Sequence, residues 1–304
     1  MKYNIILHIT TSCNYNCSYC DVIKDNKALS KYNREDILSF INLNNNSINR
    51  FKFFWWEPLL AWSDMKYIID KSNNIIWNNY EIVTNTTLLS DEIWYYFKKY
   101  FKIIFFSIDV ENMFDYEKVY KFIKKYDLEN KVYFNLVVNP WKEEESLNQF
   151  KKLYNLWFRW FNILPVYFTK HWFKDNLLSF SKIMKLILNV YINDNKLKLY
   201  WFRENNWEDV SLANNTFFID INNKIYYSDI VSTFIWKKIE RELFLGNVIG
   251  FDLKRFIYYD FEKEKKSISK LEKNIYNKVN WQKELHTIMD YFSKYLNNIH
   301  AKKK

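Results

Sequence analysis

Short runs of β-branched and aromatic residues alternate with segments of helical periodicity over most of this chain. The expected strands are 3–10, 50–54, 80–84, 103–108, 131–138 and 161–168, and the expected helices are 33–43, 63–74, 90–100, 116–126, 143–156 and 177–191. Strands that alternate with helices at this spacing form parallel βαβ units. The pattern predicts an α/β fold, a partial (β/α)6 barrel of the TIM type. A full β/α barrel and an open doubly wound sheet are the alternatives.

The pattern changes near residue 195. Residues 217–221 and 225–230 predict a β-hairpin with an Asn-rich turn, and apolar residues between 267 and 300 recur at helical intervals. The sequence therefore predicts two domains. These are a barrel domain over residues 1–195 and a small α+β extension over residues 196–304.

Composition limits the class of protein. The apolar share of 49% and the charged share of 26% are typical of a globular chain, and no apolar run approaches the roughly 18–20 residues of a membrane span. The net charge of +10 comes mainly from scattered Lys, so a nucleic-acid partner is not expected. The first residues are typical of a strand and not of a signal peptide, which predicts a cytoplasmic protein without membrane contact.

All 3 cysteines lie within one short window directly after the first expected strand: Cys13, Cys17 and Cys20, in a C-x3-C-x2-C spacing. This spacing excludes a disulfide framework. A structural zinc ion usually takes four protein ligands, and no His flanks the window at a suitable distance. Thiolates favour iron–sulfur clusters, and three ligands on a four-iron cluster leave one iron free to bind another molecule. A zinc or sensor site and three incidental thiols are the alternatives.

The cysteine window resembles the motif of the radical S-adenosylmethionine (radical SAM) superfamily, C-x3-C-x-aromatic-C, with Tyr19 at the aromatic position. Three further segments, each after an expected strand, are similar to the family in the same order. They are Trp55-Trp56-Glu57-Pro58 where the family has Gly-Gly-Glu-Pro, Thr84-Asn85-Thr86-Thr87 where it has Thr-Asn-Gly-Thr, and Ser107-Ile108-Asp109-Val110 where it has Ser-Ile-Asp-Gly. The resemblance covers about residues 3–195.

The resemblance implies both a chemistry and a set of site residues. Cys13, Cys17 and Cys20 would hold a 4Fe-4S cluster that binds S-adenosylmethionine (SAM) and cleaves it reductively. The product is a 5′-deoxyadenosyl radical that abstracts hydrogen from a substrate. The residues implied to contact the cofactor are Tyr19, Trp55, Trp56, Glu57, Pro58, Asn85, Ser107 and Asp109. An electron donor of the flavodoxin or ferredoxin type and sensitivity to oxygen are implied as well.

The C-terminal hairpin is similar to the SPASM extension of radical SAM enzymes that modify peptides and proteins. The segment from Phe217 to Asp229 and the later Leu245-Gly246-Asn247 carry this resemblance, but Ser228 stands where a cysteine is typical, and no cysteine follows Cys20. The extension is therefore expected without auxiliary clusters. The resemblance implies a peptide or protein substrate. The alternatives are a small-molecule enzyme or glycyl-radical activase, and a non-catalytic iron–sulfur protein with a degenerate SAM pocket.

Glycine and tryptophan occur in unusual numbers. The chain has 2 Gly and 13 Trp, whereas a protein of this length has roughly twenty Gly on average. Several Trp stand where turns favour glycine, namely Trp55, Trp56, Trp62, Trp141 and Trp207. Our hypothesis is that many Trp positions are glycine in the native protein, because some bacteria read the UGA codon as glycine. The alternative is a genuine Trp-Trp protein whose SAM site is blocked.

Overall fold

The structure, a computed structural model, describes residues 2–18, 20, 24–109, 111, 114–139, 142–165, 173–200, 216–226 and 244–255. Several sequence predictions concern residues outside these ranges. Among them are the aromatic position Tyr19, the Trp positions 141 and 207, Ser228 and the helical segment 267–300.

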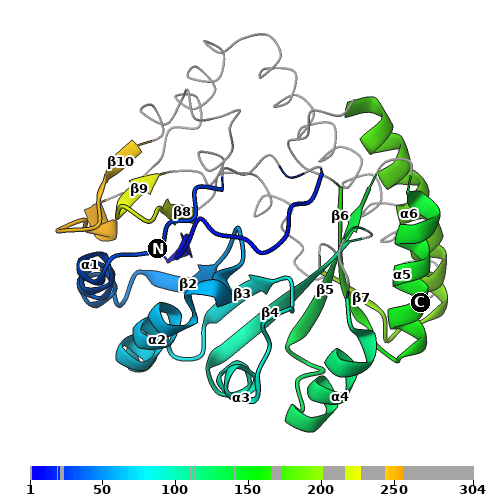
Figure 1. Cartoon of the computed structure of the whole chain (residues 1–304), viewed down its shortest axis with the longest axis horizontal. Coiled ribbons are helices and arrows are strands. Elements are labelled where there is room, and N and C mark those ends of the chain that lie inside the picture. The colour runs from blue at the N-terminus through cyan, green and yellow to red at the C-terminus, as the bar shows by residue number, and fades with distance from the viewer. Residues whose placement is uncertain are drawn as a thin grey trace.

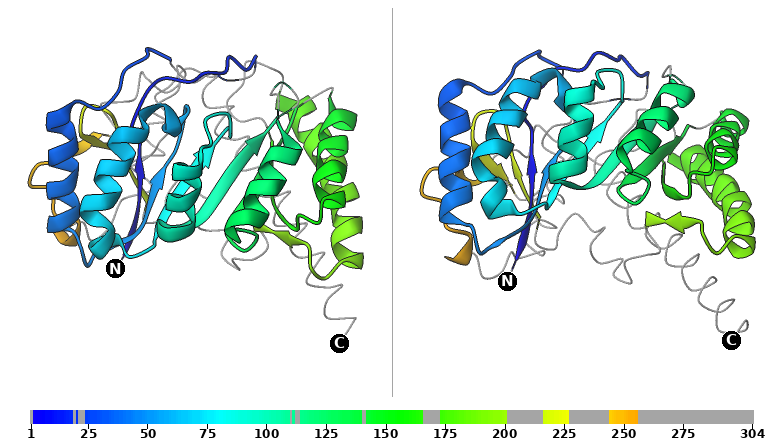
Figure 2. Two further views of the ribbon diagram at one scale, coloured as in Figure 1. Left: turned by 60° about the horizontal axis from the view of Figure 1, so that its bottom comes forward. Right: turned by 90° about the horizontal axis from the view of Figure 1, so that it is seen from below.

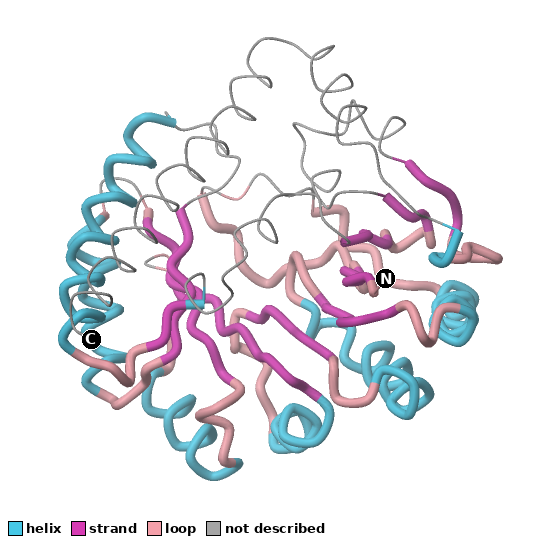
Figure 3. The backbone as a smooth tube through the Cα atoms, turned by 180° about the vertical axis from the view of Figure 1, so that it is seen from behind, coloured by secondary structure: helices cyan, strands magenta, loops and turns pink. Residues whose placement is uncertain are grey.

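Six parallel strands, each followed by a helix, form the body of the protein (Figure 1). The strands are β1 (Tyr3–Leu7), β2 (Ile48–Phe53), β3 (Tyr80–Thr84), β4 (Phe101–Ile108), β5 (Val132–Val138) and β6 (Trp160–Pro165). The helices are α1 (Lys31–Leu43), α2 (Trp62–Ile76), α3 (Asp91–Tyr100), α4 (Tyr116–Tyr126), α5 (Glu143–Asn155) and α6 (Phe173–Asn193). The strands lie side by side in chain order, and the helices cover the convex side of a curved sheet (Figure 3). The predicted α/β fold, a partial (β/α)6 barrel, is confirmed.

Short strands extend this sheet at both edges. β7 (Lys198–Leu199) pairs with β6, while β8 (Thr216–Ile219), β9 (Lys224–Tyr226) and β10 (Phe244–Asn247) continue the sheet beyond β1. β8 is parallel to β1, and β9 and β10 are antiparallel to their neighbours. The predicted hairpin is therefore present as β8–β9 and belongs to the same sheet as the barrel. The domain boundary near residue 195 stays a prediction.

Local sequence signals account for where several helices begin. Ser30, Ser90 and Asp115 precede α1, α3 and α4, and the side chain of each accepts a hydrogen bond from a backbone N–H of the first turn. Such caps satisfy donors that have no partner within the helix. None of the helices that the structure describes has the length and apolar character needed to span a bilayer.

The two faces of the central strands carry different side chains. On β4, Ile104 and Phe106 belong to the main core under the helices, while Phe105 packs with Val83 and Tyr133 in a separate cluster on the opposite face. We call this second, concave side of the sheet the inner face. Strand alternation places every second residue of β3 to β6 on it.

Two helices end on tryptophans with left-handed backbone. Trp77 follows α2 with φ 40°, and Trp157 lies just beyond α5 with φ 68°. Both indoles are largely exposed, at 74% and 72%. Glycine is the usual residue at such helix ends, because a residue with a Cβ atom costs about 1–2 kcal/mol in this conformation. Trp62 differs, since its φ of −54° is ordinary and its backbone does not require glycine.

We expect Trp77→Gly and Trp157→Gly each to raise the free energy of unfolding by about 1 kcal/mol, because glycine removes the left-handed strain. Because both indoles are largely exposed, replacing them removes few packing contacts. Urea denaturation measures the change. Trp62→Gly is the matched control and should lower stability, because its indole donates a hydrogen bond to Glu92 and packs edge-on against Tyr96. Destabilisation by all three changes would contradict the prediction.

Candidate active site

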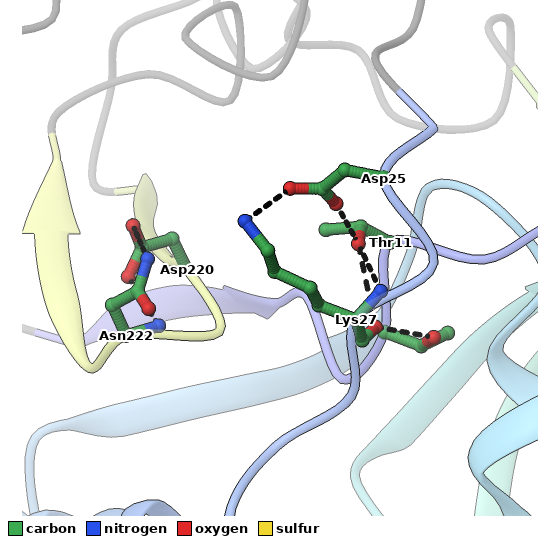
Figure 4. A network of polar contacts seen from close by, with 6 residues as sticks. Thr11, Asp25, Lys27, Asp220 and Asn222 are labelled. Carbon is green, nitrogen blue, oxygen red and sulfur yellow. Dashed lines mark hydrogen bonds and ion pairs between the residues drawn. The ribbon is translucent and has the colours of Figure 1, made fainter.

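A long loop after β1 carries the cysteines and runs across the upper ends of the strands in Figure 2. The base of this loop is closed by hydrogen bonds between Thr11 and Lys27. The N–H of Thr11 donates to the Lys27 carbonyl at 2.7 Å, and the N–H of Lys27 donates to Thr11 Oγ1 at 2.8 Å. Asp25 accepts a hydrogen bond from the Thr11 hydroxyl and forms an ion pair with Lys27 (Figure 4). We call residues 12–24 the cysteine loop.

The cysteine loop is fastened to the ends of β2 and β4. The N–H of Glu57, beyond β2, donates to the carbonyl of Ser12 at 3.1 Å. Glu111, beyond β4, accepts two hydrogen bonds from Ser18, one from its N–H at 2.8 Å and one from its hydroxyl at 2.6 Å. The sequence gives no signal for the Ser18–Glu111 contact, because Ser18 stands at a variable position of the cysteine motif and Glu111 lies 93 positions further along the chain.

Asparagine side chains fasten the same loop to the end of β3. Asn85 Nδ2 donates to Asn14 Oδ1 at 2.7 Å, and Asn14 Nδ2 donates to Thr87 Oγ1 at 2.6 Å. The Thr87 hydroxyl donates in turn to Asn85 Oδ1 at 2.7 Å. Asn85, a predicted site residue, therefore lies directly against the cysteine loop.

The three thiols are partly exposed on this loop. The N–H of Cys20 donates to the carbonyl of Cys17 at 3.1 Å, and the N–H of Tyr15 points to Cys13 Sγ at 3.5 Å. Burial raises the pKa of the Cys13 thiol, while the Tyr15 N–H and the Lys24 charge act in the opposite direction. Among the described residues, no three His, Cys, Asp or Glu side chains converge closely enough to hold a metal ion. The kind of donor nevertheless fits an iron–sulfur cluster, because thiolates are the ligands that such clusters take and all three lie on this loop.

Glu57 is fully buried between the ends of β2 and β3. Its carboxylate accepts hydrogen bonds from the N–H of Leu59 at 3.0 Å, the Thr84 hydroxyl at 2.8 Å and the N–H of Asn85 at 2.7 Å. Burial raises the pKa of Glu57 to about 7, and the three donors act in the opposite direction. Pro58 is buried behind it as the first residue of the 3₁₀ helix η1 (Pro58–Ala61). Through these contacts Glu57 joins the end of β2 to the end of β3.

Stability should therefore depend on pH through Glu57. Its carboxyl group stays protonated in the folded protein up to about pH 7, whereas the unfolded chain releases this proton near pH 4.3. The contribution of Glu57 to the free energy of unfolding should therefore fall as pH rises from about 4 to 7, by at most about 3.5 kcal/mol. Urea denaturation at several pH values measures this slope. Glu57→Gln should flatten it, and the exposed control Glu92→Gln should not. A slope that Glu57→Gln leaves unchanged would show that another group causes it.

Trp55 and Trp56 follow β2 with φ 67° and 50°. Two consecutive residues with a Cβ atom are rare in this conformation. The Trp56 ring stands edge-on to the buried His8 ring with 4.6 Å between centroids, and the Trp55 ring lies 4.8 Å from that of Phe54. Burial lowers the pKa of His8 well below its usual value, so this imidazole is neutral. The backbone at positions 55 and 56 is the kind that glycine adopts without strain.

The two predicted site residues of the fourth strand lie in different surroundings. Ser107 faces inward from β4, two positions after Phe105 on the same face. Asp109 is buried beyond the strand end, where its Oδ1 accepts the N–H of Glu111 at 2.7 Å. Asp109 thereby shapes the turn that presents Glu111 to Ser18. The structure thus brings Glu57, Asn85 and the Asp109 turn to the cysteine loop, and it places Ser107 deeper on the inner face.

Comparison with known families finds a match to the family described as Radical SAM superfamily over residues 7–153. The radical SAM cyclopropyl synthase TigE of Paramaledivibacter caminithermalis is 29% identical over 129 residues, a region that covers 36% of this chain and 27% of TigE. An uncharacterized protein of Methanocaldococcus jannaschii, MJ0907, is 33% identical over 97 residues, or 31% of this chain and 33% of that protein. The chain thus matches about a third or less of these relatives.

Solved structures share the fold over most of the chain. Native anSMEcpe with bound AdoMet has a TM-score of 0.67 at 16% identity, and the match covers 88% of this chain and 82% of that one. SuiB of Streptococcus suis, bound to the precursor peptide SuiA, has a TM-score of 0.61 at 12% identity, with 86% and 66% covered. At these identities the likeness concerns the fold.

Proposed function

We propose that this chain, which belongs to the radical SAM superfamily, generates a 5′-deoxyadenosyl radical and uses it to abstract hydrogen from a peptide or protein side chain. The 4Fe-4S cluster of this family, when bound, supplies the electron that cleaves SAM. Cys13, Cys17 and Cys20 would hold it, since they are the only cysteines of the chain. The observation that carries the proposal is the cysteine loop, which is closed at its base and fastened to the ends of β2, β3 and β4.

The residues around the loop would position the cofactor. Glu57 keeps the ends of β2 and β3 together, and Asn85 holds the loop over them. We assign Ser107 and the Asp109 turn to the nucleoside side of the site, because both follow from β4 beside the loop.

The working form of the site would carry glycine at positions 55 and 56. Both residues have positive φ, and so have Trp77 and Trp157 far from the site, whereas the chain has only 2 Gly. A backbone without side chains at 55 and 56 leaves room for a ligand to approach its N–H groups. The indole of Trp56 instead packs against His8.

A peptide substrate is supported by two observations. SuiB, whose structure contains the precursor peptide SuiA, has the same fold. The hairpin β8–β9, which is similar to the SPASM extension, adjoins β1 and so lies beside the strand from which the cysteine loop starts. In the cell, a protein of the flavodoxin or ferredoxin type would supply the electron. In the assay for 5′-deoxyadenosine described next, dithionite can replace it.

Release of 5′-deoxyadenosine tests the function. The full chain with Trp55→Gly and Trp56→Gly is reconstituted anaerobically with iron and sulfide, reduced with dithionite and supplied with SAM. We expect 5′-deoxyadenosine in chromatographic analysis, and none from the same protein with Cys17→Ala. A preparation with a full complement of iron and sulfide that releases no 5′-deoxyadenosine would refute the proposal.

A further inference from the structure

Glu111 joins the cysteine loop to the ends of β4 and β5. Its carboxylate accepts the N–H of Ser18 at 2.8 Å and the Ser18 hydroxyl at 2.6 Å. From the end of β5, Asn139 Nδ2 donates to the same carboxylate at 3.4 Å, and Lys142 Nζ lies 3.5 Å from it. The N–H of Glu111 donates to Asp109 at the end of β4. These contacts give the carboxylate a defined position beside the loop.

The carboxylate of Glu111 is ionised at neutral pH. Burial raises its pKa, but the two Ser18 donors and the Lys142 charge outweigh this effect, so the pKa lies below its usual value. The Glu111 side chain is only 19% exposed, and water therefore screens its charge less than that of a surface residue. In the described part of the chain, Ser18 contacts the carboxylate and not the ammonium of Lys142. The negative charge thus faces the loop.

This charge lies close to one of the predicted cluster ligands. Ser18 directly follows Cys17, so its nitrogen is bonded to the carbonyl carbon of that residue. Covalent geometry limits the distance from the Ser18 nitrogen to Cys17 Sγ to about 5 Å, and the hydrogen bond to Glu111 adds 2.8 Å. A carboxylate oxygen is therefore within about 8 Å of Cys17 Sγ. At this distance, a partly buried charge affects a neighbouring redox centre.

Glu111 also determines where the donors of Ser18 point. Hydrogen bonds to the sulfurs of an iron–sulfur cluster raise its reduction potential, because they stabilise the negative charge that reduction adds. The cysteine loop has one contact of this kind, in which the Tyr15 N–H points to Cys13 Sγ. Both donors of Ser18 are instead directed to Glu111. The carboxylate thus keeps two donors from sulfur and adds a negative charge, and both effects oppose reduction.

We propose that Glu111 lowers the reduction potential of the 4Fe-4S cluster that the cysteine loop binds. A lower potential makes the reduced cluster a stronger reductant, and reductive cleavage of SAM requires one, because the cluster must give one electron to the sulfonium. Glu111 acts through its charge and through Ser18, so it is a positioning residue. The inference deepens the proposed function and rests on it, because it concerns the electron transfer that precedes radical formation.

A redox titration tests the inference. The reconstituted full chain with glycine at 55 and 56 is reduced stepwise with titanium(III) citrate, and electron paramagnetic resonance measures the reduced cluster at each potential. Glu111→Gln keeps the size of the side chain and removes its charge. We expect the ratio of reduced to oxidised cluster at a fixed potential to rise about tenfold, which is a positive shift of about 59 mV for one electron.

Two further variants separate an effect of charge from a loosening of the loop. Lys142→Met removes the opposing positive charge and should shift the midpoint in the negative direction. Glu129→Gln is the matched control, because this carboxylate also pairs with a lysine, Lys124, at 2.9 Å, but precedes β5 and so lies at the opposite end of that strand from the cysteine loop. It should leave the midpoint unchanged.

Three results would overturn the inference: a midpoint in Glu111→Gln that is equal to or below the parent's, a positive shift in Lys142→Met, or a shift in Glu129→Gln as large as that in Glu111→Gln. If Glu111→Gln takes up too little iron to be titrated, the sign of the shift in Lys142→Met decides. The titration needs neither SAM nor turnover. A failure here is therefore separate from a failure to release 5′-deoxyadenosine.

Discussion

The double change Trp55→Gly, Trp56→Gly should raise the affinity of the reconstituted protein for SAM by about ten- to hundredfold. Both positions have left-handed backbone, and their indoles occupy the space next to His8 and Phe54. Forcing a ligand into a site filled by large side chains costs about 1–3 kcal/mol, which corresponds to this range of affinity. Equilibrium dialysis with labelled SAM measures it, and iron content should not change.

Trp62→Gly is the control for this prediction. Trp62 lies only a few residues further along, but its φ is −54° and its indole contacts Glu92 and Tyr96 on α3. Its removal should leave SAM affinity unchanged. If the double glycine variant and the parent bind SAM equally, the indoles are tolerated, and the genuine Trp-Trp protein becomes the better interpretation.

Replacing any one of Cys13, Cys17 and Cys20 by Ala should abolish the cluster and, with it, all release of 5′-deoxyadenosine. Each thiolate holds one iron, and the chain has no other cysteine to take its place. Iron and sulfide analysis after anaerobic reconstitution, with the thiolate–iron absorption band, gives the first readout. Product analysis gives the second.

Ser18→Ala is the matched control within the same loop. It removes one hydrogen bond to Glu111 and keeps the other, which comes from the backbone N–H. Iron content should therefore stay close to that of the parent. A cysteine variant with iron and sulfide at the parent's level would exclude the three-thiolate site.

The sequence predicts best the elements whose signals are local. The strand 80–84 and the helix 116–126 begin and end where expected, because one is a buried apolar run and the other starts after the capping residue Asp115. The first strand was predicted to continue to residue 10 but ends at Leu7. Beyond it the backbone N–H of His8 donates to Ile219, and Thr11 pairs with Lys27, contacts that no local pattern reveals.

In the candidate active site, too, the sequence predicts which residues lie near one another but not the contacts that they make. The motifs after three strands predict that Glu57, Asn85 and Asp109 converge, and they do so around the cysteine loop. Their individual contacts were not predictable. Glu57 accepts hydrogen bonds from Leu59 in η1 and from Thr84 and Asn85 at the end of β3, and Asp109 accepts one within its own turn. The hydrogen bond between Asn135 and Asn162 was not predictable either, because the two residues become neighbours only when β5 pairs with β6.

The left-handed helix ends have a practical consequence for producing this protein in a standard expression host. Backbone angles divide the described tryptophans into two sets: Trp55, Trp56, Trp77 and Trp157 have positive φ, whereas Trp62, Trp94 and Trp160 lie within a helix or strand. A synthetic gene should encode glycine at the first four positions and keep tryptophan at the other three. Trp94 shows why indiscriminate replacement would fail. Its indole is fully buried and stacks on the Phe122 ring with 5.3 Å between centroids. Its loss would leave a cavity and lower the free energy of unfolding by about 3–5 kcal/mol.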